Sequence, residues 1–170
     1  PVVELEPHLI REQDLMEPGM IFPASKLVER PGELWVYYAA RGYQHYADSP
    51  GDHNDVSYNL AVMRQDGFAC LRTQSGKRGV WRAAPLTLPE TATELHVNAD
   101  VAGALAAEVL DPASGEPLTG LSAVDCKAFS GDATDTLLAW ESAGLNKAAG
   151  KKVRLRFVMT DGQIFSFWFE

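Results

Sequence analysis

Hydrophobic and polar residues alternate with a period of two along most of the chain. Such runs occupy 33–40, 56–63, 94–100, 103–111, 135–140, 152–159 and 163–170. They are short, rich in β-branched and aromatic residues, and bounded by Gly, Pro, Asp or Asn, as is typical of strands. Only 144–152 and 11–17 have the pattern of a turn or two of helix. The sequence therefore predicts an all-β protein.

The run at 152–159 divides its residues between two faces. Four apolar side chains share one face and two arginines share the other: Val153, Leu155, Phe157 and Met159, against Arg154 and Arg156. A sheet with one apolar and one solvated face is antiparallel in character. Many short strands between turn residues are typical of an antiparallel β-sandwich, of the jelly-roll or concanavalin-like kind, or of a β-propeller blade.

Turn residues mark the joints between these runs. Asp161 and Gly162 separate the last two runs and predict a hairpin, and the segment 111–117 predicts a second turn. The segment 64–71 forms a joint between two parts of the chain that differ in their turn residues.

The two halves differ in the length of their loops. A polar, aromatic loop at 41–55 separates the strands of the first half, whereas the connections after Gly67 are compact. A loop of that length is uncommon in a compact domain unless it has a function. The joint at 64–71 is thus either part of one domain or the boundary between two.

Composition and charge narrow the class of partner. The formal net charge is −8, and the one dense basic segment, 151–156, alternates with apolar residues as a solvated strand face does. Binding to a phosphate backbone draws its affinity from clustered Lys and Arg. No apolar run approaches the roughly 20 residues of a membrane span. We therefore expect neither a nucleic acid nor a membrane as a partner.

The two cysteines, Cys70 and Cys126, fit neither a disulfide framework nor the spacing of a zinc site. We expect two buried free thiols, with a disulfide across the fold as the alternative. The cysteines leave the cellular compartment open.

The loop at 41–55 contains the candidate ligand contacts. They are two tyrosines, two histidines and an acid: Tyr43, His45, Tyr46, His53 and Asp55. Aromatic faces beside imidazole and carboxylate groups suit a sugar, because rings stack on C–H faces while polar groups bind hydroxyls. His45, His53 and Asp55 also suit a divalent metal. The alternative is a solvent-exposed polar turn without a ligand.

Two further groups have both a functional and a structural interpretation. Trp81 would be a carbohydrate platform if exposed, although large aromatic residues, Trp168 included, more often belong to the core. Asp125, Asp132 and Asp135 could line a calcium site, but they lack the pattern of an EF-hand loop and fit turns better. The chain contains no G-x-S-x-G, Walker, H-E-x-x-H or dinucleotide motif. The catalytic residues stay unassigned, and we expect no cofactor.

The order of the segments resembles a known family. The segment 60–71 is followed by "APLTL", "LHVNAD", the hairpin-like segment 103–126, "GDATDTLLAW", "KKVRLRFVM" and "QIFSFWFE". This order is similar to the C-terminal end of bacterial glycoside hydrolase-like proteins related to families 32 and 43. The chain departs from the pattern at Leu121, where an aromatic residue is expected, and at Ile164 and Phe165, where Leu and Tyr are commoner.

The resemblance implies a five-bladed β-propeller followed by a β-sandwich. Residues 1–66 would be the last blade and its approach, and 67–170 the accessory sandwich that stabilises the propeller. Asp66 and Gly67 would make the turn between the two, and Phe68 would begin the core of the sandwich. The resemblance places the catalytic carboxylates upstream of Pro1, so this chain alone is not expected to be an enzyme. It also implies a carbohydrate partner, the upstream propeller as a second partner, and an extracellular or periplasmic location. The alternatives are a stand-alone carbohydrate-binding module and a structural or partner-binding sandwich without a ligand.

Overall fold

The computed structural model describes residues 20–41 and 56–170. All strand pairs in these ranges are antiparallel, and the 3-10 turn Leu145–Ala148 is the one helical element there. The all-β prediction is therefore confirmed, and the helical pattern at 144–152 corresponds to this single turn. The segment 11–17 lies outside the described residues. No helix in the described ranges has the length and apolar character needed to cross a membrane.

The chain divides into two compact units between Phe68 and Ala69. This division lies two residues beyond the boundary expected from the sequence. The predicted turn at Asp66 is confirmed, because Asp66 has a φ of 58° and the Gly67 N–H donates to the Arg64 carbonyl oxygen at 2.9 Å. The expectation that Phe68 begins the second core is wrong, because 54% of Phe68 is exposed.

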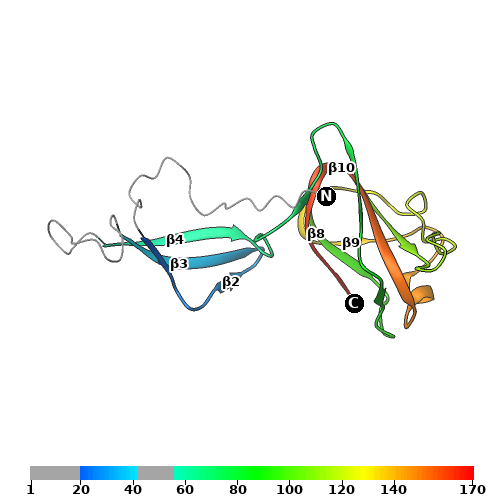
Figure 1. Cartoon of the computed structure of the whole chain (residues 1–170), viewed down its shortest axis with the longest axis horizontal. Coiled ribbons are helices and arrows are strands. Elements are labelled where there is room, and N and C mark those ends of the chain that lie inside the picture. The colour runs from blue at the N-terminus through cyan, green and yellow to red at the C-terminus, as the bar shows by residue number, and fades with distance from the viewer. Residues whose placement is uncertain (1–19, 42–55) are drawn as a thin grey trace. The chain divides into compact units, whose positions relative to one another are not determined.

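The first unit is a four-stranded sheet built around one central strand (Figure 1). Its strands are β1 (Met20–Pro23), β2 (Val28–Arg30), β3 (Glu33–Arg41) and β4 (Val56–Arg64). β1 and β2 pair with successive parts of one edge of β3, and β4 pairs with the whole of its other edge. β3 and β4 coincide with the predicted runs at 33–40 and 56–63, because alternation and turn residues agree there.

The second unit is a six-stranded sheet centred on two long strands. Its strands are β5 (Leu71–Arg72), β6 (Arg78–Arg82), β7 (Leu86–Thr87), β8 (Leu95–Leu110), β9 (Phe129–Leu138) and β10 (Lys152–Phe169). β10 pairs with β8 along one edge and with the short strands β5, β6 and β7 along the other. β9 pairs with the free edge of β8.

The strands β8 and β10 bend together, and the sheet folds back on itself. Each joins two runs that the sequence presents as separate strands, so the predicted hairpin at Asp161 and Gly162 is wrong. In an extended strand, Phe157 and Phe167 would lie about 33 Å apart. Their ring centroids are 5.5 Å apart, and Figure 1 shows β10 turning back on itself. The two halves of the sheet thus enclose one core between them, an arrangement compatible with a β-sandwich.

Two glycines permit this bend. A β-carbon on Gly103 would lie 2.3 Å from the Thr160 carbonyl oxygen, and one on Gly162 would lie 2.9 Å from the Val101 α-carbon. The register of β10 against β8 shifts between Thr160 and Gly162, which marks a β-bulge. Bulges bend strands and increase their twist. Gly162, which together with Asp161 predicts a hairpin in the sequence, instead allows two backbones to approach closely, as does Gly103.

The core of the second unit lies between the two halves of the sheet. Its fully buried side chains include Leu95, Val97, Leu105, Val109, Leu155 and Phe157. The connections on either side of β9 contribute Leu121, Trp140 and Leu145 to the same cluster. Two side chains of these connections form hydrogen bonds with the backbone of Ala107. Trp140 Nε1 donates to the Ala107 carbonyl oxygen at 3.0 Å, and the Ala107 N–H donates to Cys126 Sγ at 3.4 Å. These contacts cover the edge of β8 where β9 no longer pairs with it.

One ion pair is buried beside this edge. Glu108 on β8 is 6% exposed and accepts hydrogen bonds from Arg156 Nε and, at 3.1 Å, from the Ala123 N–H. Burial raises the pKa of Glu108, but the Arg156 hydrogen bond, the Ala123 N–H and the charges of Arg156 and Arg78 outweigh it and hold the pKa below its usual value. The folded chain thus favours the ionised carboxylate.

We expect Gly103→Ala to destabilise the second unit by about 2 kcal/mol or more, because the added carbon collides with the Thr160 carbonyl. Chemical denaturation followed by Trp fluorescence measures this change. Ala102→Ser, at the neighbouring exposed position, is the control and is expected to change stability by less than about 0.5 kcal/mol. Equal stabilities of the two variants would contradict the close approach.

We expect Glu108→Gln to destabilise the chain by about 3 kcal/mol at pH 7, because it leaves the Arg156 charge without its partner. Since the folded pKa of Glu108 is lowered, its stabilisation is present above the unfolded pKa, near 4.5, and is lost as the pH falls through the folded pKa. Denaturation midpoints between pH 7 and pH 3 should therefore fall less steeply for the variant. Glu90→Gln, which changes an exposed carboxylate, should follow the wild type.

Candidate functional site

The loop residues proposed to contact a sugar lie outside the described residues. They are Tyr43, His45, Tyr46, His53 and Asp55, all within the range 42–55. A sugar or metal contact at this loop stays a prediction.

Trp81 packs at the edge of the core and lines two hollows. It lies on β6 opposite Phe157, and the two rings stack with centroids 5.4 Å apart. Its centroid is also 5.9 Å from that of Phe167. The indole is half-buried, and the two hollows beside it share Leu71, Trp81 and Ile164 in their walls. Trp81 therefore contributes to packing, and its contact with a glycan stays a prediction.

The three acids considered for calcium have separate roles. Asp125 lies in a turn and accepts a hydrogen bond from Ser122 Oγ at 2.6 Å. Asp132 lies opposite Asp100 in the β8–β9 register, and Asp135 lies beside His96. These three aspartates do not come together as metal ligands. In the described ranges, the group that has the spacing of metal ligands is Glu94, His96 and Glu170.

This group results from the pairing of the start of β8 with the end of β10. His96 lies directly opposite Trp168 in the register. Two residues further along, Glu94 and Glu170 lie opposite each other, since the N–H of each donates to the carbonyl oxygen of the other, at 2.9 and 3.2 Å. Side chains two residues apart share a face of a strand. All four side chains therefore lie together on the face opposite the core.

Asp135 reaches the same face from β9. The register of β9 against β8 shifts between Val97 and Ala99, so Asp135 lies at a β-bulge. Bulges often direct a side chain toward a neighbouring site. We call Glu94, His96, Asp135, Trp168 and Glu170 the His96 cluster.

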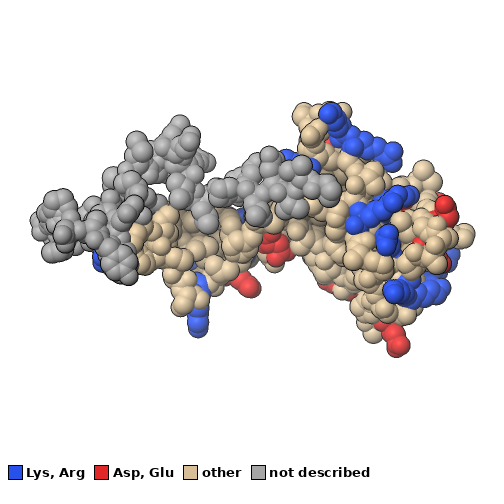
Figure 2. Space-filling model, in the orientation of Figure 1, with Lys and Arg blue, Asp and Glu red and all other residues tan. Residues whose placement is uncertain are grey.

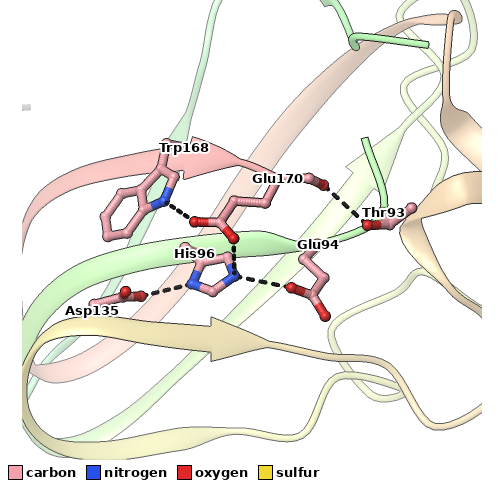
Figure 3. Close-up of polar contacts among 6 residues, drawn as sticks. All are labelled: Thr93, Glu94, His96, Asp135, Trp168 and Glu170. Atoms are coloured by element: carbon pink, nitrogen blue, oxygen red, sulfur yellow. Dashed lines mark hydrogen bonds and ion pairs between the residues drawn. The ribbon is translucent and has the colours of Figure 1, made fainter. Parts of the chain in front are cut away.

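The imidazole of His96 is surrounded by carboxylates (Figure 3). Its Nδ1 lies 2.6 Å from Asp135 Oδ1, and its Nε2 lies 3.3 Å from Glu94 Oε2 and 4.0 Å from Glu170 Oε2. Trp168 stacks on the imidazole with ring centroids 5.5 Å apart and donates from Nε1 to Glu170 Oε1 at 3.3 Å. Both ring nitrogens thus face acidic oxygens.

This environment favours a cation at the centre of the cluster. Burial lowers the pKa of His96, but the hydrogen bonds with Asp135 and Glu94 and the charges of Asp135 and Glu170 outweigh it and raise the pKa above 6.5. Like charges directly opposite each other on paired strands are destabilising. The facing carboxylates of Glu94 and Glu170 therefore favour either an imidazolium or a metal ion between them.

Two short segments of the sequence could have indicated this cluster, although the alternation of apolar and polar residues did not single them out. The runs E-L-H at 94–96 and W-F-E at 168–170 each place two polar or aromatic side chains on one face. Their juxtaposition depends on the register of β8 against β10, which local patterns do not specify. Trp168, first interpreted as a core residue, is half-buried and covers the imidazole.

The two cysteines differ in their burial. Neither cysteine forms a disulfide in the structure; Cys126 is buried and Cys70 is half-buried, so the expectation of two buried thiols is right for Cys126 alone. Burial raises the pKa of Cys126, which keeps its thiol protonated. A protonated, buried thiol is a poor nucleophile.

No match to this chain was found among protein-family models, curated proteins or solved structures.

We expect His96 to titrate above pH 6.5 in the presence of a chelator, and Asp135→Asn to lower that pKa because it removes the charge beside Nδ1. Histidine NMR resonances measure both values, with His96→Gln identifying the signal. Asp132→Asn, which changes a β9 acid that faces Asp100, should leave the pKa unchanged. Equal shifts in the two aspartate variants would contradict the assigned contact.

Proposed function

We propose that this chain is the non-catalytic C-terminal part of a carbohydrate-active β-propeller protein. In this proposal the sheet of β1–β4 belongs to the last blade, and the unit from Ala69 is the accessory sandwich. The order of sequence segments supports the family, and an exposed apolar sheet face supports the role of the first unit.

The observation that carries the proposal is one face of the first sheet. The β3–β4 register pairs Trp35 with Val62, Tyr37 with Leu60 and Ala39 with Tyr58, so these six side chains share a face. Phe22 on β1 and Val28 on β2 join them, opposite Ala39 and Trp35. We call these eight residues the apolar face.

Much of the apolar face is accessible to solvent. Tyr58 is 87% exposed, Val62 51%, Tyr37 47% and Phe22 43%. The part of this sheet that is visible in Figure 2 carries few charged side chains. Contiguous exposed apolar surface on this scale is typical of a protein interface. A four-stranded antiparallel sheet with such a face has what a propeller blade needs in order to pack on the next blade.

The second unit fits the accessory role because it encloses its own core. Its buried cluster draws on both halves of the bent sheet and on the connections around β9. A unit of this kind is able to support a neighbouring domain without supplying catalytic groups. In this proposal the catalytic carboxylates come from blades upstream of Pro1, and any glycan contact at Trp81 or at the 42–55 loop is secondary.

The proposal is tested by labelling the apolar face in this chain and in a polypeptide extended upstream through the preceding blade. In a Cys70→Ser background, Tyr58→Cys should react rapidly with a maleimide in the present chain. We expect the extended polypeptide to react at least about tenfold more slowly, because the neighbouring blade would cover the face. Val124→Cys, at a site that is 94% exposed in the second unit, is the control and should react equally in both.

Three results would contradict the proposal. The first is equal labelling of Tyr58→Cys in the two polypeptides. The second is a coding sequence without a further strand-rich segment before Pro1. The third is robust hydrolysis of aryl glycosides or oligosaccharides by the present chain, since the proposal places the catalytic groups elsewhere.

A further inference from the structure

We propose that Glu94, His96 and Glu170 bind a divalent transition-metal ion of the zinc class. The ligand atoms would be Nε2 of His96 and one carboxylate oxygen from each glutamate. The proposal concerns the outer face of the second unit and does not depend on the proposed function.

One of the distances between the three ligand atoms already matches a tetrahedral ion, and the third ligand atom lies close enough to reach it by a small movement. Zn–N and Zn–O bonds of about 2.0–2.2 Å place neighbouring ligand atoms about 3.3–3.5 Å apart. His96 Nε2 and Glu94 Oε2 are 3.3 Å apart, and all three ligand atoms lie within 4.8 Å of one another. The Glu170 oxygen lies 4.0 Å from Nε2. Both glutamate side chains are about half exposed, so a small rotation of each carboxylate can complete the geometry.

The neighbours of the ligands hold them in place. Asp135 accepts from Nδ1 of His96 and so leaves Nε2 directed at the two glutamates, the arrangement of a carboxylate–histidine–metal triad. Trp168 stacks on the imidazole, and its N–H holds Oε1 of Glu170, which leaves Oε2 of that residue toward His96. The imidazole is fixed on both sides, and its side chain is only 14% exposed.

The donor set and its charge identify the class of ion. One imidazole nitrogen with two carboxylate oxygens suits zinc and its neighbours, whereas calcium and magnesium prefer oxygen ligands alone. A divalent ion would offset the repulsion between Glu94 and Glu170, which lie side by side on paired strands. Three protein ligands leave a fourth position for water.

Calorimetric titration of the chelator-treated full chain with Zn²⁺ at pH 7.5 tests the proposal. We expect one equivalent to bind with a Kd of about 10 μM or below and to raise the melting temperature, because the ion binds the folded chain. His96→Gln and Glu94→Gln should each weaken binding by at least about tenfold, and Asp135→Asn by about tenfold. Ca²⁺ and Mg²⁺ should bind more weakly than Zn²⁺.

Matched variants separate this site from other zinc ligands. Asp132→Asn on the same strand, and the double variant His45→Gln with His53→Gln, should bind as the wild type does. Trp168→Phe should retain binding but lose the zinc-dependent part of the Trp fluorescence change. Melting curves in chelator show that each variant is folded.

Two outcomes would overturn the proposal. One is a wild-type chain without saturable Zn²⁺ binding below about 1 mM, the affinity of a weak surface contact. The other is Zn²⁺ binding with the wild-type Kd in both His96→Gln and Glu94→Gln; loss of binding in the His45 and His53 double variant would then place the ion elsewhere. Neither outcome bears on the apolar face, whose labelling test uses different residues.

Discussion

The continuous pairing of β8 with β10 is the constraint on which the second unit depends. The two strands stay hydrogen-bonded through a shared bend, so both halves of the sheet turn together. This bend brings Phe157 into contact with Phe167 and closes the core. It also gives β10 a long second edge, on which β5, β6 and β7 pair in succession.

The same pairing places apolar side chains on one face of the sheet and polar side chains on the other. Residues such as Val97 and Leu155 lie between the two halves, whereas His96 and Glu108 lie on the opposite face. A buried carboxylate on that face needs a partner, and Arg156 supplies it from the adjacent strand. At the start of β8, three carboxylates of the His96 cluster surround one imidazole, and a positive charge on that imidazole reduces the repulsion between them.

Alternation and turn residues predicted β3 and β4 well, because each is a single extended run between clear boundaries. They failed at β8 and β10, because glycines that bound a strand in the sequence, as Gly103 and Gly162 do, also permit a bulge within one continuous strand. The short strands β5 and β7 have only two residues each, and their pairing with β10 defines them more than any local pattern does. The His96 cluster depends on register, and register is a property of two distant segments together.

The two irregularities in the β8–β10 pair offset each other. β8 carries an extra residue between Val101 and Ala104, and β10 carries one at Phe165. The strands are therefore in the same phase before the first bulge and after the second. Across the second bulge, Ile164 and Phe167 both face the core although they are three residues apart, because Phe165 is the extra residue and the pairs on either side of it, Ile164–Ala99 and Phe167–Val97, keep their faces. Insertions and deletions in β10 are therefore expected at this bulge, where β10 already has one residue more than β8 between paired positions, and not within the regular stretches on either side.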